Sequence, residues 1–166
     1  MADEAKIRFA LDSSLGKLSK WLRILGFDSV YVPGKPGESF RLYGIEGRIL
    51  LTRARQIQAR NPGHLVIFIR FNNPQDQLRQ VISDLELDFS DIKPFSRCIR
   101  CNLSLQEIPR EQIRSFVPDY VYETRFSFRK CSSCGRIYWP GSHVNAGMNT
   151  IREIFELSAT HKPSIK

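Results

Sequence analysis

Four cysteines, arranged as two C-x-x-C pairs, are the residues of this sequence best suited to chemistry. The pairs are Cys98 with Cys101 and Cys131 with Cys134, and the chain contains no other cysteine. Two residues between paired cysteines let both sulfurs face one point, so two pairs can supply four thiolates in a tetrahedron. Because this is the ligand set of a structural zinc ion, the sequence predicts a zinc site.

Two other uses of paired cysteines compete with zinc. Two disulfides would suit a secreted protein, but the opening sequence MADEAKIRFA lacks the basic and then apolar build of an export signal. A redox-active pair is the other alternative, but two copies that flank one short segment fit that use poorly. We therefore favour zinc, and we expect the protein to be cytoplasmic.

The composition indicates a globular protein with an anionic partner. The 166 residues carry a formal net charge of +8 at pH 7, and nucleic acid is the commonest partner of basic proteins. The alternative is that the basic side chains are only solvated. No apolar run approaches the ~18 residues that a membrane helix needs, so we expect no membrane association.

A regular alternation of strands and helices precedes the cysteines. Residues 6–11 predict a strand, and an apolar stripe from Leu15 to Leu25 predicts a helix that ends at Gly26. The alternation continues, and it predicts an α/β fold with a parallel sheet sandwiched by helices over residues 1–93. The other expected strands are 27–32, 48–52 and 65–70, and the other expected helices are 38–45, 53–60 and 74–85.

Polar residues follow several of these strands directly. In parallel α/β sheets, binding sites lie at the carboxyl ends of the strands. Asp12, the turn at 52–55 and the turn at 71–74 all fall at this edge of the predicted sheet. Asp12 can also act as a plain helix cap.

The pattern changes after residue 93, where helical periodicity weakens. We expect a four-cysteine ribbon over residues 94–145, in which the alternating segment 120–128 forms a strand that pairs with 136–139. Residues 141–143 are expected to form a loop. Residues 146–166 should hold a short helix at 148–157 and a loose end after Ala159.

Several long motifs, in order, resemble the Mut-seven C-terminal RNase domain. They read FALDSSLGKLSKWLRILGFDS near the start, then EGRILLTR at 46–53, FSRCIRC at 95–101, VPDYVYET at 117–124 and CSSCGRIYWPGSH at 131–143. The resemblance implies a PIN-like α/β domain with a C-terminal zinc ribbon. It further implies an RNA partner, single-stranded or structured, and hydrolysis of RNA with Mg²⁺ or Mn²⁺ held by carboxylates.

The acidic positions of the family are matched unevenly. Asp12 falls at the first acid and Glu38 near a second, although Glu38 also suits a helix start that attracts negative charge. The family usually reads LLTRD at the third strand, whereas this chain reads LLTRA and places Ala54 there. Asp76 is a weaker candidate for a late ligand. The resemblance therefore supports the fold and an RNA partner better than it supports catalysis.

Three hypotheses for the function remain open. The first is a metal-dependent ribonuclease, the second a catalytically decayed RNA-binding module, and the third a protein-interaction adaptor that uses the ribbon. Salt-dependent RNA binding would separate the second from the third. The candidate RNA contacts are Lys17 and Lys20, which can also be only a wet helix face, the arginines Arg48, Arg53, Arg55 and Arg60, and His143.

Overall fold

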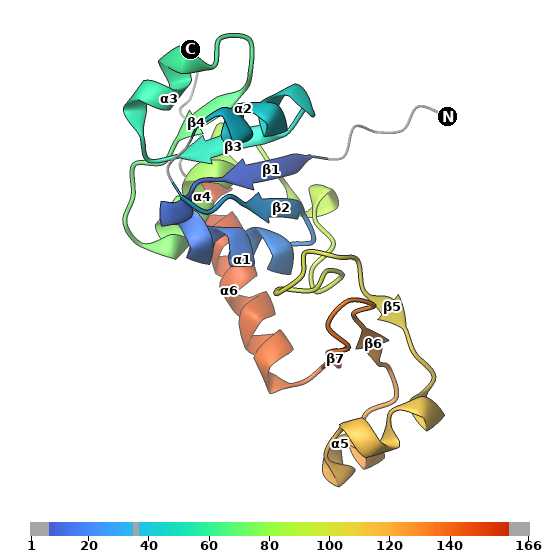
Figure 1. Cartoon of the computed structure of the whole chain (residues 1–166). Coiled ribbons are helices and arrows are strands. Elements are labelled where there is room, and N and C mark those ends of the chain that lie inside the picture. The colour runs from blue at the N-terminus through green and yellow to red at the C-terminus, as the bar shows by residue number, and fades with distance from the viewer. Residues whose placement is uncertain (1–6, 35–36, 160–166) are drawn as a thin grey trace, which may run out of the picture.

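The computed structural model describes residues 7–34 and 37–159. Its main sheet has four parallel strands in the order β2-β1-β3-β4, which confirms the predicted α/β fold (Figure 1). Phe9 of β1 lies opposite Ser29 of β2 and Ile49 of β3. The strands are β1 (Arg8–Leu11), β2 (Asp28–Tyr31), β3 (Ile49–Thr52) and β4 (Val66–Phe68).

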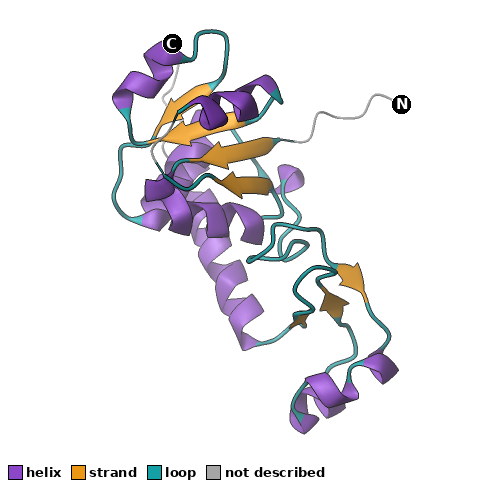
Figure 2. Cartoon of the chain, viewed as in Figure 1, coloured by secondary structure: helices purple, strands orange, loops and turns teal. Residues whose placement is uncertain are grey.

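Helices cover both faces of this sheet, as Figure 2 shows. Alternate residues of each strand point to opposite faces, so neighbours such as Leu50 and Leu51 enter different apolar clusters. Leu51 packs with residues of α1 (Gly16–Ile24) and α4 (Pro74–Asp84), whereas Leu50 packs with α2 (Glu38–Ile45) and α3 (Arg55–Arg60). The two central strands, β1 and β3, are therefore buried on both sides, as is usual in parallel sheets.

The C-terminal helix α6 (Ser142–Ala159) is longer than the sequence pattern indicated. It begins at Ser142, so the expected loop at 141–143 is wrong for its last two residues. Ile151, Ile154 and Phe155 are buried in the same cluster as α1 and α4. This burial explains the length, because the helix is held by the core of the α/β part. Residues after 159, with their expected loose end, lie outside the described residues.

The cysteine-bearing part contains a small antiparallel sheet in the order β5-β6-β7. Its strands are β5 (Gln106–Glu107), β6 (Arg129–Lys130) and β7 (Ile137–Tyr138). The predicted strand at 120–128 is wrong, because α5 (Asp119–Thr124) occupies its first half. β7 pairs instead with β6, directly after that segment.

Local packing explains why α5 replaces the expected strand. Pro118 stands at the N-cap position without a side-chain capping bond, and Asp119 lies in the first turn, where negative charge is favourable. Val121 is buried with Ile113, Val117 and Phe128 in a cluster apart from the main core. The division of the chain at residues 93 and 145 stays a prediction. Within the described residues, no helix is both long enough and apolar enough to cross a membrane.

Candidate metal centre and basic groove

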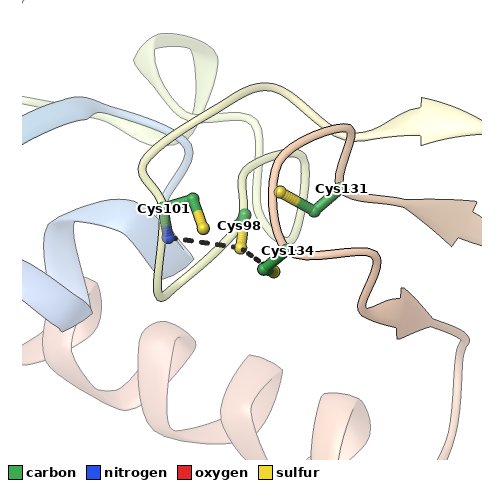
Figure 3. Close-up of side chains that lie close together, drawn as sticks. All are labelled: Cys98, Cys101, Cys131 and Cys134. Atoms are coloured by element: carbon green, nitrogen blue, oxygen red, sulfur yellow. Dashed lines mark hydrogen bonds between the residues drawn. The ribbon is translucent and has the colours of Figure 1, made fainter.

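The four cysteine sulfurs converge on one point, as Figure 3 shows. Their ligand atoms all lie within 4.8 Å of one another, and all four thiols are free. The sulfurs of Cys98 and Cys134 are 3.8 Å apart, which is also about the separation of two sulfurs around a tetrahedral zinc with Zn–S bonds of about 2.3 Å. The cysteines can therefore hold a metal ion, and their chemistry fits zinc and a zinc ribbon.

Two tight turns with the same backbone geometry present these sulfurs. The residue after each pair adopts a left-handed conformation, with φ of 63° at Asn102 and 69° at Gly135. The amide of Asn102 donates to the carbonyl of Cys98, and the amide of Gly135 donates to the carbonyl of Cys131. Asparagine and glycine are the residues that tolerate this conformation best.

Hydrogen bonds also favour the thiolate form of Cys98. Burial by itself would raise the pKa of this thiol, but the Tyr138 hydroxyl, 3.2 Å from the sulfur, and the amide of Cys101 lower it to about 6. The thiolate is the form that binds a metal. Tyr138 thus belongs to the metal centre, whereas Trp139 packs against the apolar cluster around Val121.

The first cysteine turn, at 98–102, is bonded directly to the α/β part. Arg23 of α1 donates to the carbonyls of Ile99 and Arg100 at 2.8 and 3.0 Å. The Asn102 side chain donates to Asp28 at 2.7 Å and accepts the amide of Ser29 at 3.0 Å. The turn is therefore fixed against α1 and the edge strand β2.

Arg48 is part of this support. Its guanidinium makes two bonds of 2.9 Å to the Asp28 carboxylate, and its side chain is only 10% exposed. Burial would raise the pKa of Asp28, but the bonds from Arg48 and Asn102 lower it below its usual value. Arg48 precedes β3 and Asp28 begins β2, so this pair lies at the amino ends of the strands, away from the edge that holds Asp12.

Asp12 is buried, and each of its carboxylate oxygens accepts two hydrogen bonds. Oδ1 accepts the amide and hydroxyl of Ser14 at 2.9 and 2.5 Å, and Oδ2 accepts the hydroxyl of Thr52 at 2.6 Å and the amide of Arg53 at 2.8 Å. These four donors fill the acceptor positions that a carboxylate offers. Asp12 therefore caps the turn after β1 and braces it against the end of β3.

Replacing Asp12 with asparagine should lower the free energy of unfolding by about 2–4 kcal/mol at neutral pH, because the amide cannot accept all four bonds. Burial would raise the pKa of Asp12, but the bonds from Ser14, Thr52 and Arg53 lower it below 3.8. The carboxylate's stabilisation is therefore complete above pH 3.8 and is lost as the pH falls below it.

The difference in the free energy of unfolding between wild type and Asp12→Asn should consequently become smaller in acid. Urea unfolding of both proteins at neutral pH and at decreasing pH measures this difference. Glu156→Gln, on the exposed side of α6, is the matched control and should show neither effect. A stability difference that stays constant down to the folded pKa would contradict the assigned hydrogen bonds.

The acids proposed for Mg²⁺ or Mn²⁺ do not come together. Within residues 7–34 and 37–159, the cysteines form the one group of three or more side chains of metal-ligand type. Glu38 is an exposed acid in the first turn of α2, and Asp76 pairs with Arg79 in α4. Ala54 offers no ligand and packs against the cluster around Leu50. The residues present do not fit a carboxylate-held metal at this edge.

An open groove of about 650 Å³ runs along α1, from Ser14 and Arg53 at the carboxyl edge of the sheet to Arg23 in the last turn of the helix. Five of its lining side chains are cationic, and among the described residues that line it none is acidic. Lys17, Lys20 and Arg23 are three residues apart and share one face of α1. The cations are Lys17, Lys20, Arg23, Arg53 and Arg100.

Opposite the helix, Arg53 follows β3 and donates to the side chain of Asn72 at 2.6 Å. Arg100 reaches the groove from the first cysteine turn, 77 positions beyond Arg23. Lys17, Lys20 and Arg53 are among the contacts predicted from the sequence, whereas Arg23 and Arg100 are not. The spacing of Arg23 from Lys17 and Lys20 on one helix face could have indicated Arg23. No local pattern indicates Arg100, because only the docking of the turn brings it to α1.

The remaining candidate contacts lie outside the lining of this groove. The guanidinium of Arg55 stands 5.3 Å from the ring centre of Phe68. Arg60 is exposed in the last turn of α3, and His143 is exposed in the first turn of α6. As contacts to RNA these three residues stay predictions.

Comparison with known families shows which family the chain is related to. The family described as the Mut7-C RNAse domain matches residues 7–151, which is most of the sequence. The chain belongs to the Mut7-C RNase domain family. Neither a curated protein nor a solved structure matches it. The Mut7-C match includes α1, the cysteine turns and all five groove cations.

Proposed function

We propose that this Mut7-C protein binds RNA and holds the phosphodiester backbone in the basic groove. The observation that carries the proposal is the presence of five cations in the lining of the groove, with no acidic side chain among its described lining residues. Phosphates bind such surfaces because each contact releases condensed counterions. The net charge of +8 and the family both support a nucleic-acid partner.

We further propose that the metal of the cysteine centre is a structural zinc ion. Four thiolates leave no open position for a substrate or an activated water. The role of the ion in RNA binding is therefore indirect. It fixes the turn that carries Arg100 and that accepts the bonds from Arg23.

Hydrolysis of RNA is the second candidate function, and the family match favours it. The carboxylates favour RNA binding without hydrolysis, because Asp12 is saturated by protein donors and position 54 carries alanine. Labelled RNA incubated with Mn²⁺, Mg²⁺ or EDTA separates the two functions. Cleavage that requires added Mn²⁺ or Mg²⁺, by protein that keeps its zinc content and melting temperature, would make hydrolysis the function.

Neutralising a groove cation should weaken RNA binding and its dependence on salt together. For Lys17→Gln, Arg53→Gln and Arg100→Gln we expect affinity losses of about 3- to 10-fold each, and a salt slope reduced by about 0.7 per lost phosphate contact on single-stranded RNA. Fluorescence anisotropy of a labelled RNA, titrated at several salt concentrations, measures both quantities.

Arg41→Gln is the matched control for these variants. Arg41 is an exposed arginine of α2, which covers the face of the sheet opposite α1. It should bind RNA with unchanged affinity and salt slope. Groove variants that bind as tightly as wild type, with the same slope, would overturn the proposed function.

A further inference from the structure

A compact insertion connects strands β5 and β6 of the small sheet. It comprises residues 108–128, and Figure 1 places its helix α5 at the end of the ribbon farthest from the main sheet. Its interior is already complete, since Ile113, Val117, Val121 and Phe128 are buried together. The other aromatic side chains of the insertion are therefore not needed to fill its core.

Three aromatic side chains of this insertion are instead turned to solvent. The exposed fractions are 71% for Phe116, 69% for Tyr120 and 76% for Phe126. Single exposed apolar residues are ordinary on protein surfaces, but several on one small unit mark a binding surface. Aromatic rings differ from other apolar groups because each offers a flat face for stacking.

Arginines alternate with the aromatic rings of the insertion. The guanidinium of Arg110 lies 4.3 Å from the ring centre of Tyr122 and 5.0 Å from that of Phe126. Arg114 approaches the Tyr122 ring at 5.5 Å. Arg110 is also fixed, because it donates to the carbonyl of Tyr122. The planar groups thus run Phe126, Arg110, Tyr122, Arg114.

The cations beside the rings select the chemistry of the partner. Lys130 stands 5.8 Å from the ring centre of Phe116, and Arg110 lies closer still to the rings of Tyr122 and Phe126. Rings interleaved with cations match a ligand that carries flat bases on an anionic backbone. Residues 108–128 themselves carry equal numbers of basic and acidic side chains, so the placement of the cations at the rings, and not the net charge, favours an anionic partner. The basic residues are Arg110, Arg114 and Arg125, and the acidic ones are Glu111, Asp119 and Glu123.

We propose that this aromatic–arginine surface stacks on unpaired bases of RNA, a second contact that rests on the proposed function of the groove. Phe116, Tyr120 and Phe126 supply the stacking faces, and Lys130 and Arg110, the cations beside Phe116 and Phe126, contact the flanking phosphates. Because paired bases hide their faces inside a duplex, the surface selects single-stranded segments. The groove contacts the backbone alone and accepts either form.

The test compares a labelled oligouridine with a labelled duplex RNA by fluorescence anisotropy. Phe126→Leu and Phe116→Leu, which keep apolar bulk but remove the ring, should each bind oligouridine about tenfold more weakly. Their affinity for the duplex should not change. Phe126→Trp, which keeps a stacking face, should bind oligouridine at least as tightly as wild type. Metal content and the melting temperature of each variant verify that the insertion is folded.

The outcomes separate this inference from the proposed function. If Lys17→Gln weakens both RNAs while the leucine variants bind like wild type, the stacking surface is refuted and the groove stands. If neither Lys17→Gln nor the leucine variants change RNA binding, both proposals are refuted, and the exposed rings would then be assigned to a protein partner. A loss of affinity that is equal for oligouridine and duplex would also overturn the selection of unpaired bases.

Discussion

Replacing Cys98 with serine is expected to release the metal and unfold the cysteine-bearing part of the chain. A structural zinc in small domains contributes about 10–16 kcal/mol of binding free energy, which folding then depends on. The described part of the ribbon has only two-residue strands and one small apolar cluster to replace that contribution. Removing the buried sulfur of Cys98 should therefore have the largest effect of any single substitution.

The unfolding should stop at the α/β part. α6 is held there by Ile151, Ile154 and Phe155, whose contacts do not involve the cysteines. We expect the variant to contain no bound zinc, to keep the helical signal of the main sheet domain, and to be cut by trypsin between residues 97 and 136. Metal analysis and limited proteolysis measure these outcomes.

Loss of the metal should also change the lining of the basic groove. Arg100 would leave the lining, and Arg23 would lose the carbonyls of Ile99 and Arg100 that orient it. RNA affinity should consequently fall by at least as much as in Arg100→Gln. Ser132→Ala, an exposed position between Cys131 and Cys134, is the matched control. A Cys98→Ser protein with full metal content and an unchanged proteolysis pattern would rule out the four-cysteine centre.

Gly26→Ala is expected to destabilise the protein by about 2–5 kcal/mol, from left-handed strain and overpacking together. Gly26 ends the first helix with φ of +96°, and a Cβ there would lie 2.4 Å from the carbonyl oxygen of Lys93. That oxygen belongs to the backbone and is held in place, because the amide of Lys93 donates to Leu25 and that of Phe95 to Ile24. Neither the new Cβ nor the Lys93 carbonyl oxygen can therefore rotate away from the other.

The close approach separates this glycine from others with similar backbone angles. Gly63 has φ of +86°, but no heavy atom lies within 4 Å of its built Cβ. Gly63→Ala should therefore cost only about 1–2 kcal/mol, the left-handed strain alone. Urea unfolding of both variants gives the comparison. Equal losses in the two would show that the segment at 93–96 does not press on the end of α1.

Local features of the sequence determined the α/β order and the metal ligands. Strand and helix periodicities, the cap at Asp12 and the spacing of the four cysteines act between neighbouring residues, so they can be read without the fold. The same applies to Lys17 and Lys20, which one helix face brings together. The strand predicted at 120–128 is wrong, because the burial of Val121 in a helix outweighs the alternating pattern of this segment.

Only the tertiary structure decided how distant charges combine. One oxygen of Asp12 is occupied by Thr52 and Arg53, some 40 positions away, and Arg48 is neutralised by Asp28 at the opposite edge of the sheet. Arg100 joins the groove from the cysteine turn. Charge type is written in the sequence, but whether a charge is paired or faces a ligand depends on which segments fold against it, and sequence spacing carries no information about that.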